Sequence, residues 1–155
     1  MPWTVVAIIL LSLWIGAAVL VTAVVAPAAF AVLPTRALAG ALVGRVLPVV
    51  FWSGMLVGIV VAALGPWLPH SPWRTGAAVA LVGACAAAQL VIAPRIAAIR
   101  QAAGGAIDVL DPGDPRRQAF GRLHGLSVAW MAVGGLAAIA ALVLLVRHTV
   151  VRTTA

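Results

Sequence analysis

Four long stretches of this chain contain no Asp, Glu, Lys or Arg, and this limits the folds that it can adopt. The uncharged stretches are residues 2–35, 46–73, 75–94 and 123–146. About 20 predominantly apolar residues are enough to cross a bilayer as a helix. The sequence therefore predicts an all-α fold, an integral membrane four-helix bundle that forms a single transmembrane domain over residues 1–155. The predicted helices are residues 4–33, 38–64, 75–98 and 118–146, and the predicted cytoplasmic loop is residues 99–117.

Composition supports lipid as the solvent. Only 8% of the residues are charged and 65% are hydrophobic, whereas a soluble domain carries about 25% charged residues. The net charge of +7 comes from ten Arg against three Asp. Nucleic-acid-binding proteins cluster such cations on a water-exposed face, but here they lie between apolar runs, near anionic headgroups. We therefore expect the bilayer, and not nucleic acid, as the partner.

The arginines also predict an orientation. The ends and loops that follow helices 1 and 3 hold seven of the ten, and the opposite side holds three. The positive-inside rule places the richer side in the cytoplasm, so both termini are predicted outside, in a plasma membrane of the bacterial inner-membrane type. Trp3, Trp67 and Trp73 fall at the predicted outer interface, where indoles prefer to lie.

Two short motifs occur twice in the same order. The segment VVAPAAF around Pro27 is echoed by VIAPRIA around Pro94, and the Gly-Arg at Arg45 is echoed at Arg122. Each half is thus predicted to be a helical hairpin, and two-span units keep the same orientation, so the halves would be parallel repeats.

Pairs of glycines four residues apart occur in the second and fourth predicted helices. Such pairs let helix backbones approach closely in lipid. We expect these two helices to form the central contact of the bundle, or part of a contact with another chain. The packing glycines are Gly40, Gly44, Gly54, Gly58, Gly121 and Gly125.

Polar residues inside a membrane are informative because burying them is costly. Gln89, His124 and Ser127 form a predicted polar intramembrane cluster. Three interpretations of His124 compete. It is a buried imidazole that hydrogen-bonds to Gln89, a serine or a freed carbonyl; it belongs to a path for a small solute or proton; or it binds haem or copper, with Met131 as a possible axial partner.

The arginines at the cytoplasmic helix ends, Arg45, Arg95 and Arg122, are predicted to contact lipid headgroups, to which long cationic side chains extend. The three acidic residues all lie in the 99–117 loop. Paired carboxylates, a hydrolase triad or a carboxylate metal site therefore cannot be assembled within the bundle. We expect no enzyme and no resident metal, with haem or copper as the open alternative.

Several motifs in order resemble the transmembrane protein 205 family. They are the Trp-x-Gly at Trp14, the Ala-Pro-x-x-Phe ending at Phe30, Ala-Pro at Pro94, and Phe120 followed by His124, within residues 8–146. The resemblance implies a four-helix membrane protein without an established reaction. A similar Trp, Gly and His layout occurs in copper-resistance D-type proteins and in the bacterial membrane protoporphyrinogen oxidase, which is why the metal or haem role stays open.

The favoured prediction is a small accessory or scaffold subunit of a larger membrane complex, or a homo-oligomer, acting through helix packing. The alternatives are a haem- or copper-binding membrane protein that uses His124 and a small-solute transport helper.

Overall fold

The computed structural model describes residues 2–105 and 107–153, with side chains as far as His148. The described residues are helical apart from short connections and contain no strand. The helices that are long and apolar enough to cross a membrane are Pro2–Val32, Arg36–Ala63, Pro72–Ala102 and Pro115–His148. The chain is therefore an all-α, multi-pass membrane protein, and each helix begins and ends within several residues of its predicted bounds.

Two of the four membrane helices change their winding halfway along. The first consists of α1 (Pro2–Val19), a π-helical segment η1 (Leu20–Val25) and α2 (Ala26–Val32). The third consists of α4 (Pro72–Ala86), the π-helical segment η3 (Ala87–Ile92) and α5 (Ala93–Ala102). The second is the single helix α3 (Arg36–Ala63), and the fourth is α6 (Pro115–Thr153).

Both π-helical segments end just before a proline. The backbone N–H of Ala26 reaches back to the carbonyl of Val21, and that of Ala93 reaches back to the carbonyl of Ala88. Pro27 and Pro94 follow directly. A proline has no N–H and its ring collides with the carbonyl four residues earlier, so the preceding turn must widen. The two Ala-Pro motifs thus produce the same local distortion in both helices.

Side-chain oxygen atoms cap the N-termini of three helices. Thr35 Oγ1 accepts from the N–H of Leu38 at the start of α3, and Ser71 Oγ accepts from Arg74 at the start of α4. Asp114 Oδ1 accepts from the N–H of Arg116 in the first turn of α6. These N-caps satisfy N–H groups that the helix itself leaves unpaired.

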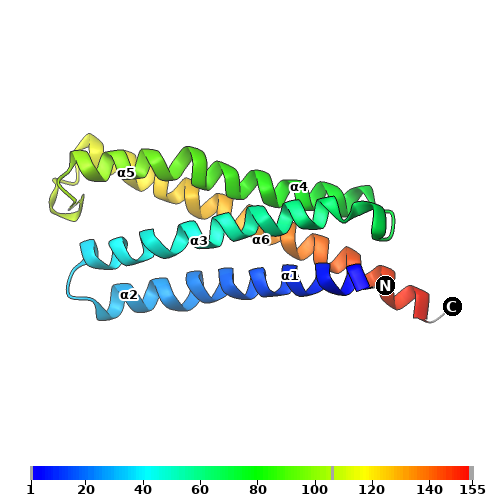
Figure 1. Ribbon diagram of the computed structural model, residues 1–155. Coiled ribbons are helices and arrows are strands. Elements are labelled where there is room, and N and C mark those ends of the chain that lie inside the picture. The colour runs from blue at the N-terminus through cyan, green and yellow to red at the C-terminus, as the bar shows by residue number, and fades with distance from the viewer. Residues whose placement is uncertain (1, 106, 154–155) are drawn as a thin grey trace.

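The helices lie side by side as a bundle (Figure 1). Its core is apolar. α4 packs most extensively on α6 and on α3, and α1 packs on the same two neighbours. The predicted central contact between the second and fourth helices is therefore wrong, because α3 and α6 lie on a diagonal and make at most marginal contact among the described residues. Residues of α4, rather than the glycines of α6, face Gly54 and Gly58 of α3. Gly54 and Gly58 are buried against Trp14, Cys85 and Val82.

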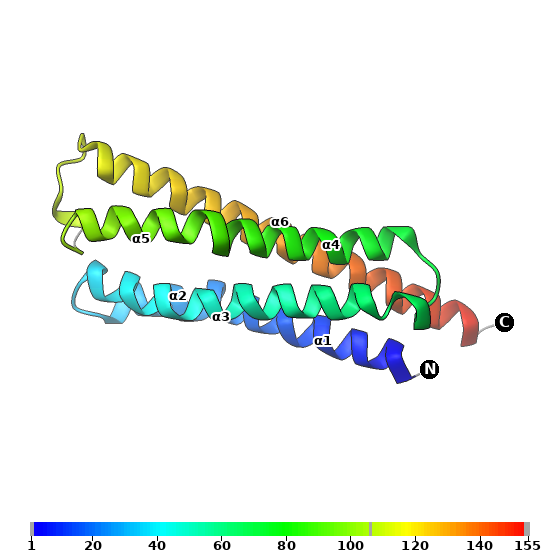
Figure 2. The ribbon, with the colours of Figure 1, turned by 45° about the horizontal axis from the view of Figure 1, so that its top comes forward.

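The bundle is closed at the end that holds the termini and open at the other end. Near the loops, α2 packs on α3 and α5 packs on α6, but neither α5 and α3 nor α2 and α6 form a substantial contact among the described residues. Figure 2 shows the two hairpins separating toward the end that holds both connecting loops. Side chains of the main core, such as Leu11, Trp14 and Leu81, are almost completely buried, whereas the open end lacks this filling.

The loop between the third and fourth helices is shorter than predicted. Helix α5 continues to Ala102 and α6 begins at Pro115, so the predicted loop bounds of 99 and 117 are too wide at both ends. Gly104 and Gly105 have φ angles of 65° and 91°, which favour glycine. A short 3₁₀ turn, η4 (Ile107–Val109), then buries Ile107 against the bundle.

Candidate functional site

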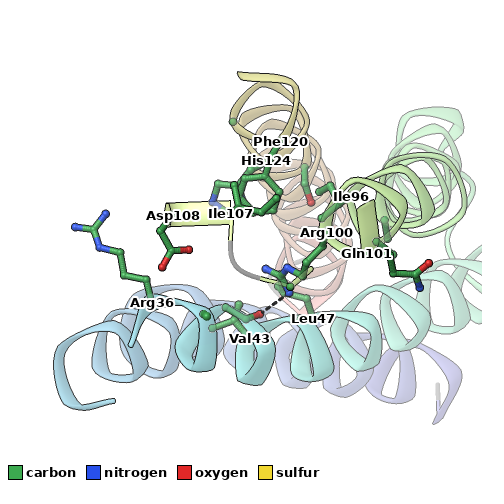
Figure 3. Close-up of a pocket in the computed structure, with 18 of the residues that line it drawn as sticks. Arg36, Val43, Leu47, Ile96, Arg100, Gln101, Ile107, Asp108, Phe120 and His124 are labelled. Carbon is green, nitrogen blue, oxygen red and sulfur yellow. Dashed lines mark hydrogen bonds between the residues drawn. The ribbon is translucent and has the colours of Figure 1, made fainter. Parts of the chain in front are cut away.

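A cavity of about 890 Å³ lies between the two diverging hairpins. Ligand pockets in proteins occupy about 300–1,000 Å³, so the space is large enough for a small molecule. Its walls come from α2, α3, η3, α5, η4 and the first half of α6, as Figure 3 shows for the labelled side chains. The polar lining residues are Arg36, Gln89, Arg100, Gln101, Asp108, Arg117, His124 and Ser127.

Arg100 connects three walls of the cavity. Its Nη1 donates a hydrogen bond of 3.2 Å to the carbonyl of Gly40 on α3. Its guanidinium carbon lies 5.6 Å from the centre of the Phe120 ring on α6, a cation–π distance. A Cβ atom at Gly40 would lie 2.9 Å from Nη2 of Arg100. Gly40 therefore provides the room that the guanidinium occupies.

Aromatic rings form the wall on α6. Phe120 and His124 are one helical turn apart, with ring centres 6.1 Å apart and planes inclined by only 2°. His124 is exposed, and the described residues include no hydrogen-bond partner for it. The interpretation of His124 as a buried, hydrogen-bonded imidazole is therefore wrong. The physical reason is that α6 packs on α1 in the closed half but makes no substantial contact with α2 at this end, which leaves the ring facing open space.

The deep end of the cavity is polar. Gln89, His124 and Ser127 all line it, so the structure brings together the three residues of the predicted cluster. They do not hydrogen-bond to one another, and the side-chain oxygen of Gln89 is buried without a partner among the described residues. A buried acceptor without a donor costs free energy, of the order of 1–3 kcal/mol. Because this oxygen has almost no accessible surface, it does not itself face the open space of the cavity.

The residues present do not fit a haem or copper ion held jointly by His124 and Met131. Both belong to one unbroken helix, α6. Seven residues along an α-helix correspond to roughly 10 Å, whereas two ligands of one metal ion lie only about 2–2.5 Å from it. Met131 also packs against the main core. The described residues contain no group of three His, Cys, Asp or Glu side chains close enough to hold a metal ion.

The three arginines predicted to contact headgroups lie outside the cavity lining. Arg45, Arg95 and Arg122 are all exposed. Of the predicted packing glycines, Gly40, Gly44 and Gly121 line the cavity, and Gly121 and Gly125 have no atom within 4 Å of a Cβ position.

Arg100 was not singled out from the sequence as a site residue. Its position near the end of a hydrophobic helix is equally typical of a lipid-facing arginine. The signal that distinguishes it is spatial, since Gly40 on another helix makes space for it. Aromatic and apolar wall residues such as Phe51 and Leu47 were missed for the same reason.

A family model described as "Domain of unknown function (DUF4149)" matches residues 9–104. This segment begins within α1, covers the rest of the first three membrane helices and ends in the loop before α6. No curated protein and no solved structure matches the chain. The resemblance to the transmembrane protein 205 family, which this match does not test, stays a prediction.

Proposed function

The chain belongs to the DUF4149 family, to which no activity is assigned, and we propose that it is a non-catalytic membrane protein that binds a small solute in the cavity at its loop end. The observation that carries this proposal is a space of about 890 Å³ within apolar helices that the polar residues Gln89, His124 and Ser127 line together. A dry, fully packed bundle would have supported a purely structural role.

The depth to which the cavity extends into the membrane also supports solute binding. Gln89 and Arg100 are eleven residues apart on one helix, which corresponds to roughly 16 Å along the axis. Half of the hydrocarbon core measures about 15 Å. A solute that enters among the arginines would thus reach about the middle of the membrane. A transport role would need a second path from there to the opposite face, which is closed by the main core.

Filling the cavity tests the proposal. Ser127→Trp places a large side chain in the cavity, and Val128→Trp places the same side chain at a neighbouring exposed position that does not line it. After gentle purification, mass spectrometry would identify small molecules that remain bound. We expect a bound solute with the unmodified protein and with Val128→Trp, and its loss with Ser127→Trp. Equal retention in all three would contradict binding in this cavity.

The favoured orientation is part of the same proposal. With the arginine-rich loops in the cytoplasm, the cavity opens on the cytoplasmic side of a plasma membrane of the bacterial inner-membrane type, and both termini lie outside. Alkaline phosphatase is active only outside the cytoplasm, so a C-terminal fusion should be active. An inactive phosphatase fusion together with a fluorescent C-terminal fluorescent-protein fusion would indicate the opposite orientation.

A second candidate function is that of an accessory or scaffold subunit, or of a homo-oligomer. The observation that favours it is the exposed pair Gly121 and Gly125, which no part of the described chain covers within 4 Å of a Cβ position. Small pairs of this kind let a neighbouring helix approach. Gly125→Leu should release a copurifying subunit or second copy, whereas Gly16→Leu, at another uncovered glycine, should not. Identical assembly of both variants would count against this role.

Binding of haem or copper with His124 as the one ligand from this chain is less well supported. It would need donors from outside the described residues, since Met131 lies two helical turns away. An optical spectrum of the purified protein checks it directly, because bound haem gives a Soret band.

A further inference from the structure

The charges around the cavity mouth point to the chemical class of the solute, an inference that rests on the proposed function. Arg36, Arg100 and Arg117 line the cavity against one carboxylate, Asp108, so its lining is cationic. Nη1 of Arg117 donates a hydrogen bond of 2.6 Å to the carbonyl of Leu110, which fixes this cation at the loop. The only ion pair among the described residues joins Arg116 to Asp114, so neither Asp108 nor any other described carboxylate neutralises Arg100.

Arg100 and Arg117 are partly buried, whereas Arg36 is exposed. One hydrogen bond to the Gly40 carbonyl and one aromatic face are the contacts of Arg100 among the described residues. A guanidinium has five N–H donors in a planar fork that matches phosphate and carboxylate oxygens. A cation in a membrane helix usually has a partner or a function because burial without one is costly. An anion would use the guanidinium donors that these two contacts leave free.

Between the arginines and the polar group of Gln89, His124 and Ser127, the walls on α3 and α5 carry apolar side chains. Val43, Leu47 and Phe51 recur every four residues along α3, and Ile96 lies on the wall formed by α5. Figure 3 shows Arg100 extending from α5 toward α3, with Val43 and Leu47 on one side and the Phe120 and His124 rings on the other. A free inorganic anion would leave this apolar surface uncovered, whereas an anionic group with an apolar body would cover it.

We propose that the cavity binds an anionic amphiphile, a phosphate or carboxylate group held by Arg100 with a short apolar chain lying along Val43, Leu47 and Ile96. This chemistry is shared by membrane lipids and by free alkyl phosphates or fatty acids. Arg100 is the residue that selects the charge, and the α3 wall selects the chain.

Titration of the purified protein in a neutral detergent tests the proposal, with bound ligand counted by native mass spectrometry. The probes are octyl phosphate, inorganic phosphate and 1-octanol, and nanodiscs of phosphatidylglycerol or phosphatidylcholine distinguish a lipid from a free anion as the source. Arg100→Gln removes the charge inside the cavity, and Arg95→Gln removes one from the exposed surface of the same helix. Gly40→Val keeps the charge but places side-chain atoms where the guanidinium lies.

We expect octyl phosphate to bind unmodified protein and Arg95→Gln equally, and at least tenfold more weakly to Arg100→Gln and Gly40→Val. Circular dichroism and gel filtration establish that each variant is folded. Retention of phosphatidylglycerol but not phosphatidylcholine would identify a lipid as the source of the ligand. Binding of octyl phosphate without retention of either lipid would identify a free amphiphile as the source. The inference would be overturned if 1-octanol or inorganic phosphate bound as tightly as octyl phosphate. It would also be overturned if Arg100→Gln and Arg95→Gln weakened octyl phosphate binding by the same factor. None of these results would contradict the proposal that the cavity binds a solute. Only the comparison of Ser127→Trp with Val128→Trp tests that proposal.

Discussion

The indole Nε1 of Trp14 donates a hydrogen bond of 2.9 Å to the carbonyl oxygen of Val50, thirty-six residues away in the chain. It joins the first and second membrane helices in the buried centre of the bundle. The same carbonyl also accepts from Ser53 Oγ at 3.0 Å. The contact lies just beyond the deep end of the cavity, where Phe51 begins the main core. The closed half of the bundle thus provides the fixed frame for the open half.

Trp14→Phe removes this hydrogen bond while it keeps an aromatic side chain. We expect the free energy of unfolding to fall by at least about 0.5–1.5 kcal/mol, the usual net contribution of one hydrogen bond. Reversible unfolding in mixed micelles measures it. Trp52→Phe is the matched control because Trp52 is 54% exposed and makes no hydrogen bond among the described residues. A change of the same size in both variants would contradict a special role for Trp14.

Gly54 permits the close approach of three helices. A Cβ atom there would lie 2.6 Å from Cys85 Sγ and 2.7 Å from Trp14 Nε1, closer than real contacts allow. Gly54→Ala should therefore destabilise the fold by about 1–3 kcal/mol, the usual cost of overpacking. Gly83→Ala, at a helical glycine with no atom within 4 Å, should cause no loss in the same unfolding assay. If Gly54→Ala is as stable as Gly83→Ala, the helices are not packed as described.

The start of α6 should loosen in acid. Side-chain hydrogen bonds from Arg116, followed by the hydrogen bond from its backbone N–H, lower the pKa of Asp114 from its ordinary value. A pKa that is lower in the folded chain means that the stabilisation is fully present above the unfolded value, about 3.9. It is lost as the pH falls through the lower, folded value.

Amide exchange of the first turn of α6, followed by NMR in micelles, measures this effect. Protection, the ratio of the intrinsic exchange rate to the observed one, should be high at neutral pH and fall in acid. Asp114→Ala should remove the protection already at neutral pH, because the N-cap acceptor is gone. Asp108→Ala serves as the control, since no hydrogen bond to the Asp108 carboxylate is formed by the described residues. Unchanged protection in Asp114→Ala would show that the cap does not hold this turn.

The sequence predicted the membrane helices well because their signal is physical and local. Charges cannot lie deep in hydrocarbon without great cost, so long stretches without charged residues mark the membrane helices, and Arg36 and Arg74 lie in the first turns of α3 and α4. Which helices meet is not encoded in this way. Gly54 and Gly58 correctly indicated that another helix packs closely on α3. Ala78 and Cys85 on α4 are also small enough for such a contact, as are Gly121 and Gly125 on α6. Glycine spacing alone therefore could not choose the partner.

The candidate site was predicted only in part, for a related reason. Gln89, His124 and Ser127 were recognisable as polar residues in apolar helices, and they do share the cavity. The divergence of the two hairpins depends on tertiary packing near the loops. Pro27 and Pro94 each distort a helix ahead of that region, but a proline in a sequence does not say in which direction the helix turns. The gap, and with it the position of Arg100, follows from the three-dimensional arrangement.

Water access to the cavity from one side of the membrane is the central claim, and thiol labelling measures it most directly. With Cys85 replaced by alanine, Ser127→Cys places the only thiol in the cavity and Val128→Cys places it on the exposed surface that faces lipid. A thiol reacts as the thiolate, which does not form in hydrocarbon. In bilayers, a charged, membrane-impermeant reagent should label Ser127→Cys at least tenfold faster than Val128→Cys. Equally slow labelling of both thiols would contradict an open, hydrated cavity.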